Sequence, residues 1–299
     1  MQFNKVAIVG MGLLGGSLGR ALREGRLASC VAGYARRPAT VEECLQIGAV
    51  DSASTDLAAV VQNAEIVLLC TPVGQMGPLA RLCLPHLSPG TVVSDVGSTK
   101  ASVVRELEPL FESSPASFIG SHPMAGSEQT GVLASRADLY RHARCVITPT
   151  AKSLPEAVLK VHALWRAVGA RTLELSPEQH DQWVARSSHL PQVLASVLAH
   201  HVLGPEQPAG LSDLCATGFR DTTRLASGSP EMWRDIALSN REALREALRA
   251  WSAELARFDA ALAGENAGAI GEFLQEARER RDAWLRGFCN PGPENGSRP

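Results

Sequence analysis

An apolar run that leads straight into a glycine-rich turn constrains the fold of this chain most. A Val-Ala-Ile-Val strand pattern opens the chain and is followed by Gly10-Met11-Gly12-Leu13-Leu14-Gly15. The first glycine permits a tight turn, the second lets the backbone approach a pyrophosphate, and the third lets the next helix pack on the strand. The alternative is a glycine-rich turn without a ligand. The predicted dinucleotide site comprises Gly10, Gly12, Leu13, Leu14 and Gly15.

Short apolar runs alternate with helix-like stretches over the first 175 residues. Alternation of this kind, with Val/Ile/Leu-rich strands, is typical of a parallel sheet covered on both faces. The fold class is therefore predicted to be α/β, with a doubly wound Rossmann-type domain over residues 1–175. The expected strands are Lys5–Val9, Cys30–Tyr34, Ile66–Cys70, Thr91–Asp95, Ser117–Ile119, Arg144–Thr148 and Arg171–Leu175. The expected helices include Ser17–Arg26, Thr40–Ile47 and Leu154–Val168.

The pattern then becomes entirely helical. Residues 176–179, Ser-Pro-Glu-Gln, combine a serine N-cap, a proline at the first helical position and a capping-box glutamine. A second start, Ser-Pro-Glu at residues 229–231, opens a long apolar-striped helix that we expect to continue to Leu262. A third helix is expected from about Ala267 to Leu285.

These helices predict an all-helical substrate and dimerisation domain over residues 176–288. The remaining tail, residues 289–299, is rich in Pro, Gly and Asn and is expected to be disordered. Because the helical part is short for a self-sufficient bundle and carries long apolar stripes, we expect a homodimer formed through the C-terminal helices.

Composition excludes several functional classes. The formal net charge is −2 and the basic residues are scattered, so no nucleic-acid partner is expected. No apolar run reaches membrane-spanning length, so no membrane association is expected. The seven cysteines lack paired spacing, which favours reduced thiols over disulfides or a metal site. The first strand begins within a few residues of the start, which leaves no signal peptide and predicts a cytoplasmic protein.

Two strand ends bear on the choice of cofactor. Enzymes that use NAD carry an acidic residue after the second strand, but this chain has Ala35 followed by Arg36 and Arg37. Arginine suits a 2′-phosphate, so NADP+ is favoured over NAD+. Alternatively, the arginines stack on adenine or face solvent, and NAD+ is still accepted. Thr71 and Pro72 follow the next strand and are expected to contact the cofactor or to end the strand.

Residues 120–126, Gly-Ser-His-Pro-Met-Ala-Gly, provide the candidate acid/base. Histidine alone has an unperturbed pKa near neutrality, and His122 follows a strand end in a run of small residues. Ser98 and Lys100 follow another strand and offer a hydroxyl and a cation near the expected nicotinamide. Ser98 could also serve as the N-cap of a helix that begins near Lys100.

Two further segments carry candidate substrate-binding groups. His189 lies two residues before Pro191, whose missing N–H predicts a helix kink. His189 either lines the site or is satisfied within the domain interface. Residues 218–224, Gly-Phe-Arg-Asp-Thr-Thr-Arg, are expected as a loop between helices. In that loop Arg220 and Arg224 form either an anion clamp or a salt-bridge network that fixes the loop.

Taken in order, these motifs resemble the prephenate dehydrogenase family, which includes arogenate and cyclohexadienyl dehydrogenases. The resemblance spans about residues 5–287, and its most specific segments are residues 120–126 and 218–224. The other segments that carry it are residues 10–17, 95–100 and 188–191.

The resemblance implies oxidative decarboxylation of prephenate to 4-hydroxyphenylpyruvate in tyrosine biosynthesis, with reduction of NAD(P)+. It implies that His122 accepts the proton of the C4 hydroxyl and that Ser98 orients this hydroxyl and the imidazole. Arg224 would bind a substrate carboxylate, with Arg220 able to exchange roles with it. Trp233 would lie at the site edge, although simple core packing is the alternative. The implied substrate-binding residues are His189, Arg220, Arg224 and Trp233.

Other functions remain open at this point. Arogenate, which carries an amino group where prephenate has a keto group, could replace it, or both could be accepted. A β-hydroxyacid dehydrogenase or imine reductase shares the two-part architecture, but its expected lysine is missing from residues 177–203. A nucleotide-sensing module without chemistry would leave His122, His189 and Arg224 without a shared purpose.

Overall fold

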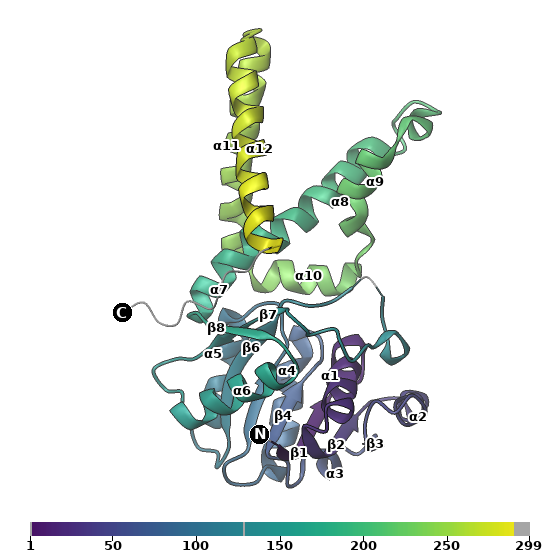
Figure 1. The fold of residues 1–299 in the computed structure, drawn as a ribbon, viewed down its shortest axis with the longest axis vertical. Coiled ribbons are helices and arrows are strands. Elements are labelled where there is room, and N and C mark those ends of the chain that lie inside the picture. The colour runs from purple at the N-terminus through teal and green to yellow at the C-terminus, as the bar shows by residue number, and fades with distance from the viewer. Residues whose placement is uncertain (1, 128, 290–299) are drawn as a thin grey trace. The chain divides into compact units, whose positions relative to one another are not determined.

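The computed structural model describes residues 2–127 and 129–289, and the chain forms two compact units, residues 1–244 and 245–299. The first unit holds one eight-stranded sheet in the order β3-β2-β1-β4-β5-β6-β7-β8 (Figure 1). The strands are β1 (Phe3–Val9), β2 (Ala28–Tyr34), β3 (Ser52–Ser54), β4 (Ile66–Leu69), β5 (Val92–Asp95), β6 (Ser117–Pro123), β7 (Arg144–Thr148) and β8 (Arg171–Glu174). The strand order reverses between β1 and β4, which creates the crevice where such sheets bind ligands.

Helices cover both faces of this sheet (Figure 1). They are α1 (Leu13–Glu24), α2 (Pro38–Gln46), α3 (Leu57–Val61), α4 (Val73–Cys83), α5 (Ala101–Phe111) and α6 (Pro155–Ala167). Alternate side chains of β1 feed two separate cores, because successive residues of a strand point to opposite faces. Ile8 packs in the core of α1, α2 and α6, whereas Ala7 and Val9 pack in the core of α3, α4 and α5. The predicted α/β fold class is confirmed.

Three details of the sheet differ from the prediction. The short edge strand β3 was missed, because its Ser-Ala-Ser sequence lacks apolar strand character. Strand β6 continues to Pro123, so His122 lies inside a strand and not after its end. Strand β7 runs antiparallel to β6, although β7 and β8 are parallel to each other. An apolar run reveals a buried strand but carries no information on its direction.

The helical segments begin with α7 (Pro177–Val184), as predicted. Ser176 Oγ accepts a hydrogen bond from the Gln179 N–H at 3.1 Å, and the capping box is complete. A π-helical turn, Ala185–His189, separates α7 from α8 (Leu190–Leu203). Because Pro191 has no N–H, it cannot donate to the carbonyl four residues earlier. The predicted interruption of this helix is therefore present as a π turn, a feature often found at functional sites.

Two predictions about the later helices were wrong. Residues 218–224 do not form a loop, since α9 spans Thr217–Thr223 and continues into a 3-10 turn, Arg224–Ser227. The hydroxyls of Thr222 and Thr223 donate to the backbone carbonyls four residues earlier. Both side chains are therefore satisfied while their residues keep the helical conformation. The long helix predicted from residue 230 is divided at Asn240 into α10 (Pro230–Ser239) and α11 (Arg241–Ala263).

The second unit contains the part of α11 from Arg245 onward and α12 (Ala267–Cys289). The rings of Phe258 and Phe273 pack with their centroids 5.2 Å apart, and Arg257 lies 4.8 Å above the Phe273 ring. The helix predicted from Ala267 is confirmed as α12. The tail predicted over 289–299 lies, apart from Cys289, outside the described residues.

Candidate active site

The three glycines of the first turn have distinct steric surroundings. Gly10 has a φ of +108°, and a Cβ there would lie 2.6 Å from the Cys70 carbonyl oxygen. A Cβ on Gly15 would overlap the carbonyl oxygen of Gly10. A Cβ on Gly12, in contrast, would meet no described atom within 4 Å. Gly10 and Gly15 are therefore required by the protein itself, whereas Gly12 faces open space suited to a ligand.

The surroundings of this turn fit a dinucleotide. Helix α1 starts after Gly12, and in the described structure no side chain caps its N–H groups and no carboxylate lies in its first turn. Those N–H groups are available to phosphate oxygens. The buried Thr71 Oγ1 has no hydrogen-bond partner among the described residues, and its side chain lies against Gly10. A buried hydroxyl left unpaired is costly, which supports a ligand contact at this point.

The end of β2 carries the three residues that bear on cofactor choice. Ala35 is buried and its N–H donates to the Ser54 carbonyl, so it offers no side-chain acceptor to a ribose. Arg36 and Arg37 are exposed, and Arg37 reaches Thr40 Oγ1 at 3.3 Å. The structure thus leaves guanidinium groups, and no carboxylate, directly after this strand.

His122 lies on the part of β6 that extends past β5. Pairing with β5 ends at Ile119, while Gly120–Pro123 pair with β7. The His122 side chain is only 8% exposed. Its main chain is therefore fixed by the ladder to β7 at the carboxyl end of β6 and not by a flexible loop.

A second histidine, missed in the sequence, contacts His122 directly. His122 Nδ1 lies 2.8 Å from His180 Nε2, and His180 Nδ1 lies 2.8 Å from Asp181 Oδ1. Asp181 also accepts hydrogen bonds from the N–H groups of Lys100 and Ala101, which start α5. Asp181, and not Ser98, therefore caps α5. The available signal was the adjacent His-Asp pair just after the capping box of α7.

Burial makes all three histidines of this cluster hard to protonate. It holds the pKa of His122 well below 6.5, and the charges of His180, Lys100 and His189 lower that pKa further. Burial also lowers the pKa of His180, although the hydrogen bond with Asp181 opposes it. The pKa of His189 falls to about 4, chiefly through burial. At neutral pH the cluster thus consists of neutral imidazoles, and a neutral imidazole can accept a proton.

A buried ion pair holds the strand that carries His122. Lys100 pairs with Asp95, and both side chains are fully buried. Lys100 Nζ also donates to the Ser121 carbonyl at 3.0 Å, and Asp95 accepts the N–H groups of Gly97 and Ser121. Trp165 Nε1 donates to Ser121 Oγ at 3.0 Å. Lys100, which was expected to lie beside a nicotinamide, therefore binds and stabilises β6 instead.

His189 sits in a second cluster with Trp233 and Asn240. It is 1% exposed, its ring lies edge-on to Trp233 with centroids 6.0 Å apart, and the Ser98 main chain hydrogen-bonds it. Asn240 Nδ2 lies 3.2 Å from His189 Nδ1 and 2.8 Å from the Asp181 carbonyl oxygen. The structure thus brings together three of the predicted site residues, and Asn240 is an additional one. The sequence pattern did not single out Asn240, because one continuous helix was expected across it.

The two predicted arginines lie on a separate helical segment. Arg220 lies on α9 and pairs with Asp221 at 3.2 Å, and both side chains are exposed. Arg224 begins the following 3-10 turn and is also exposed. The bracing and carboxylate-binding roles expected of these arginines stay predictions.

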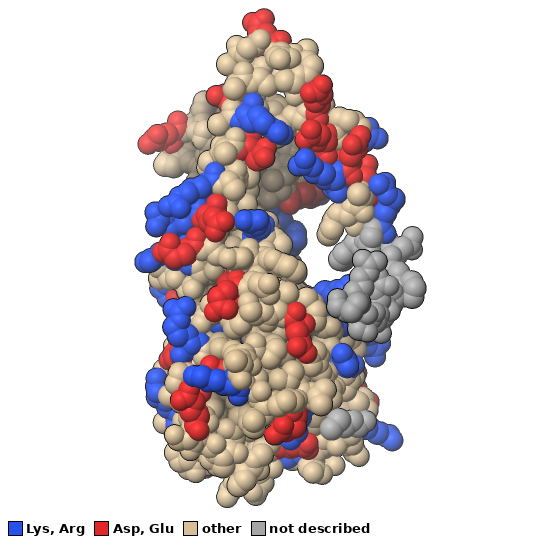
Figure 2. Space-filling model, turned by 90° about the vertical axis from the view of Figure 1, so that its left-hand side faces the viewer, with Lys and Arg blue, Asp and Glu red and all other residues tan. Residues whose placement is uncertain are grey.

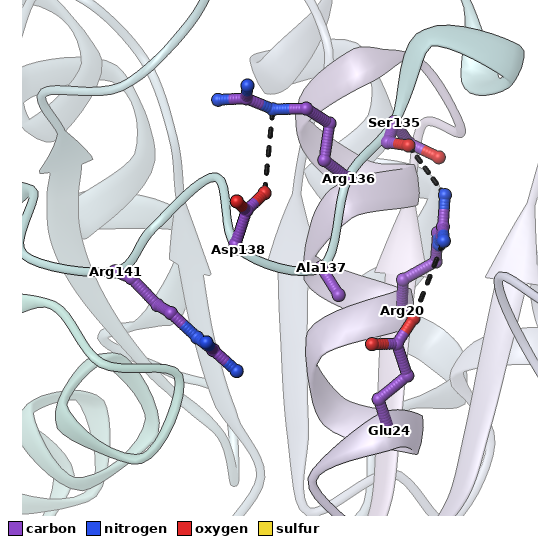
Figure 3. A pocket seen from close by; sticks show the side chains of 7 residues that line it. All are labelled: Arg20, Glu24, Ser135, Arg136, Ala137, Asp138 and Arg141. Atoms are coloured by element: carbon purple, nitrogen blue, oxygen red, sulfur yellow. Dashed lines mark hydrogen bonds and ion pairs between the residues drawn. The ribbon is translucent and has the colours of Figure 1, made fainter.

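A shallow hollow on α1 is distinct from this site. Figure 3 shows Arg20 between Glu24 and the Ser135 carbonyl, and Arg136 directed to Asp138. The cations are therefore largely paired with neighbouring acceptors. On the face drawn in Figure 2, basic and acidic side chains are interspersed, with neither sign gathered into a broad patch.

Comparison with known proteins identifies the family. Residues 18–174 match the nucleotide-binding domain of prephenate dehydrogenase, and residues 176–276 match its dimerization domain. The chain belongs to the prephenate dehydrogenase family. The resemblance noted in the sequence is thus confirmed.

Members of the prephenate dehydrogenase family align along nearly the whole chain. A cyclohexadienyl dehydrogenase from Zymomonas mobilis is 32% identical, over 93% of this chain and 95% of its own length. A prephenate dehydrogenase from Bacillus subtilis is also 32% identical, over 93% of this chain and 75% of its own. The crystal structure of prephenate dehydrogenase from Aquifex aeolicus with hydroxyphenyl propionate and NAD+ is 30% identical, with a TM-score of 0.89 over 95% of this chain and 99% of that one.

Membership of the prephenate dehydrogenase family makes the protein an NAD(P)-dependent oxidoreductase. A structure of Synechocystis arogenate dehydrogenase is similarly close, at 31% identity and a TM-score of 0.81 over 94% of this chain and 99% of that one. Within the described residues, no helix is both long and apolar enough to span a membrane.

Proposed function

We propose that this protein oxidatively decarboxylates prephenate to 4-hydroxyphenylpyruvate. The observation that carries the proposal is the neutral, buried His122 at the carboxyl end of β6. The chain belongs to the prephenate dehydrogenase family, which gives this base its expected substrate. The reaction needs orientation, a base and charge complementarity, because the gain of aromaticity drives it.

The proposed chemistry balances over three bond changes. A nicotinamide cofactor held at the turn of residues 10–15 would supply the acceptor for the hydride that leaves C4 of the ring. His122 accepts the proton of the C4 hydroxyl as the carbonyl character at that carbon develops. The bond to the ring carboxylate then breaks, CO2 leaves, and its electron pair completes the aromatic ring as a phenolate, to which His122 returns the proton. A base with a low pKa remains unprotonated and available at neutral pH.

Other residues are assigned positioning and binding roles. Ser98 would orient the hydroxyl and the His122 imidazole, and His189 and Trp233 would line the substrate pocket. Arg224 would bind a substrate carboxylate, with Arg220 and its partner Asp221 bracing this segment. These roles follow the family resemblance together with the clustering of His189 and Trp233.

The proposed cofactor preference is NADP+ over NAD+. Its support is the absence of an acid at Ala35 and the two exposed arginines that follow. The glycine turn and the unpaired Thr71 hydroxyl serve the part common to both cofactors, with Leu13, Leu14 and Pro72 beside them.

The test is formation of reduced cofactor at 340 nm with prephenate and with arogenate, each with NAD+ and NADP+. We expect turnover with prephenate and abolition of that turnover by His122→Asn. Turnover with arogenate alone would keep the mechanism but change the substrate. That second candidate is supported by the similar arogenate and cyclohexadienyl enzymes. Absence of turnover in all four mixtures contradicts the proposal.

We further propose a homodimer, with residues 1–175 as the nucleotide domain and 176–288 as the helical dimerisation domain. The match to a dimerization domain supports it, as do exposed apolar side chains such as Val197 and Leu203 on α8. Sedimentation should give twice the monomer mass of 31.8 kDa. The cytoplasm is the proposed location, since the six cysteines described as free suit a reducing compartment.

A further inference from the structure

The carboxylate of Asp181 holds the histidine cluster to the N-terminus of α5. Its Oδ1 accepts the Lys100 N–H at 2.7 Å, and its Oδ2 accepts the Ala101 N–H at 2.9 Å. Both oxygens therefore act as acceptors, at the N-terminus of α5, whose dipole favours a negative charge. His180 Nδ1 lies 2.8 Å from Oδ1 and must be the donor in that contact. His180 consequently carries its proton on Nδ1.

The tautomer of His180 determines that of the candidate base, His122. A neutral imidazole protonated on Nδ1 has a lone pair on Nε2. His180 Nε2 lies 2.8 Å from His122 Nδ1, so His122 Nδ1 must carry the proton that this contact needs. The remaining nitrogen of a neutral His122, Nε2, then has no proton. Which nitrogen of a histidine is basic is set by the hydrogen bond of the other nitrogen.

We propose that His180 and Asp181 are positioning residues that hold His122 in the Nδ1–H tautomer, so that Nε2 is the proton acceptor of the reaction. This inference rests on the proposed function for its catalytic meaning, but the tautomer itself is a property of the protein without substrate. Protonation of His122 would then place the new charge on an imidazole chain that ends at a carboxylate.

Burial favours the neutral resting state of the two imidazoles, although the nearby carboxylates oppose it at His180. Asp95 at the end of β5 and Lys100 at the N-terminus of α5 form a fully buried pair; Lys100 lowers the pKa of both rings, and Asp95 raises that of His180. Asp181 faces His180 from α7, and His189 faces both rings from the π turn. Burial keeps the pKa values of His122 and His180 below 6.5, so neither ring is charged at neutral pH.

The direct test is the solid-state 15N spectrum of the whole protein labelled at the histidine ring nitrogens, recorded at about pH 7.5 without substrate. The His122 signals are assigned by their loss in His122→Asn. The expected result is a protonated Nδ1 and an unprotonated Nε2. A His122 ring protonated on Nε2 overturns the inference, even if the protein turns over prephenate.

Two variants of His180 add a kinetic readout. His180→Leu removes the acceptor, and kcat should fall about 10- to 100-fold, in line with other partners that orient a functional histidine. The KM for the cofactor should not change, and the His122 tautomer should become mixed. His180→Gln retains a carbonyl oxygen that can accept from Nδ1–H, so it should recover part of kcat. An unchanged kcat and tautomer in His180→Leu would contradict the proposal.

His162→Leu is the matched control. His162 is also buried and also contacts a carboxylate, Glu174, at 2.7 Å, but it lies on α6. It should leave the His122 tautomer and kcat unchanged. If His180→Leu does not fold, the wild-type spectrum alone decides. Retained turnover in His122→Asn would instead refute the proposed function while leaving the tautomer assignment intact.

Discussion

Gly12 and Gly15 differ in what excludes a side chain from each position. At Gly15 the obstacle is the Gly10 carbonyl oxygen, which belongs to the fold. At Gly12 no described atom lies within 4 Å of the place that a Cβ would occupy, so the described protein does not exclude a side chain there, whereas a bound dinucleotide would. The spacing of the motif alone cannot separate these two reasons, because both positions are simply glycine.

Alanine substitutions should separate them experimentally. Gly15→Ala should destabilise the protein by about 1–3 kcal/mol, since a well-packed contact must shift. Gly12→Ala should change the free energy of unfolding by less than about 0.5 kcal/mol, yet weaken cofactor binding at least about tenfold. Urea unfolding and cofactor titration measure the two effects. Equal loss of stability in both variants would contradict this division.

Arg36 and Arg37 should decide between the two nicotinamide cofactors. Replacing both with serine should raise the KM for NADP+ about 10- to 100-fold, because hydrogen bonds to a charged phosphate contribute about 1.5–3 kcal/mol. The KM for NAD+ should hardly change. Arg81→Ser, on α4, is a control that should affect neither KM. Equal changes in the KM for NADP+ and the KM for NAD+ would show that the arginines contact the adenosine and not the 2′-phosphate.

The buried ion pair between Lys100 and Asp95 links β5, β6 and α5. Lys100→Met should destabilise the protein by about 3–5 kcal/mol, because it leaves the buried Asp95 charge without its partner. Lys152→Met removes an exposed pair with Glu112 and should have little effect on stability. Denaturant midpoints of the two variants provide the comparison. Equal midpoints would show that Asp95 is sufficiently stabilised by its main-chain donors.

The elements also show how far local sequence signals reach. The strand–turn–helix opening and the α7 capping box were predictable, because each depends on residues adjacent in the chain. The direction of β7 was not, since it depends on which neighbour the strand meets. A glycine and two threonines weaken the helix pattern of residues 218–224 and favour a loop, but propensity is a weak guide, and both threonine hydroxyls donate to carbonyls four residues earlier within the helix.

His122 was identifiable as a candidate base, whereas its contact with His180 was not. The two are separated by 58 positions, and His180 lies on a helix where a histidine usually packs or faces solvent. The contact depends on how α7 docks beside β6. Asn240 was missed for a similar reason, since its side chain satisfies the Asp181 carbonyl across 59 positions.

For the whole molecule, stability should depend on pH through the buried histidines. His189 has a pKa of about 4 in the folded protein against 6.5 in the unfolded chain. Between these values the unfolded chain binds more protons, so stability rises with pH. The contribution of His189 is complete above pH 6.5 and is lost as the pH falls towards 4. It amounts to about 2 kcal/mol between pH 6.5 and about pH 5.

Urea unfolding measured over that interval checks this prediction, since most carboxylates remain ionised there. His189→Gln should flatten the dependence, because an amide does not titrate. A wild-type free energy of unfolding that stays constant between pH 6.5 and pH 5 would contradict the neutral, buried state of these rings.

The stretch of β6 beyond β5 gives His122 little freedom to follow a substrate. Residues 120–123 are held by the antiparallel ladder to β7, and Lys100 and Trp165 bind Ser121 immediately before the base. The position of the base is therefore fixed before a substrate binds. A molecule whose hydroxyl is displaced by about 1 Å from the required place cannot be followed by the strand that carries the imidazole, and a misplacement of this size can cost about 100-fold in rate.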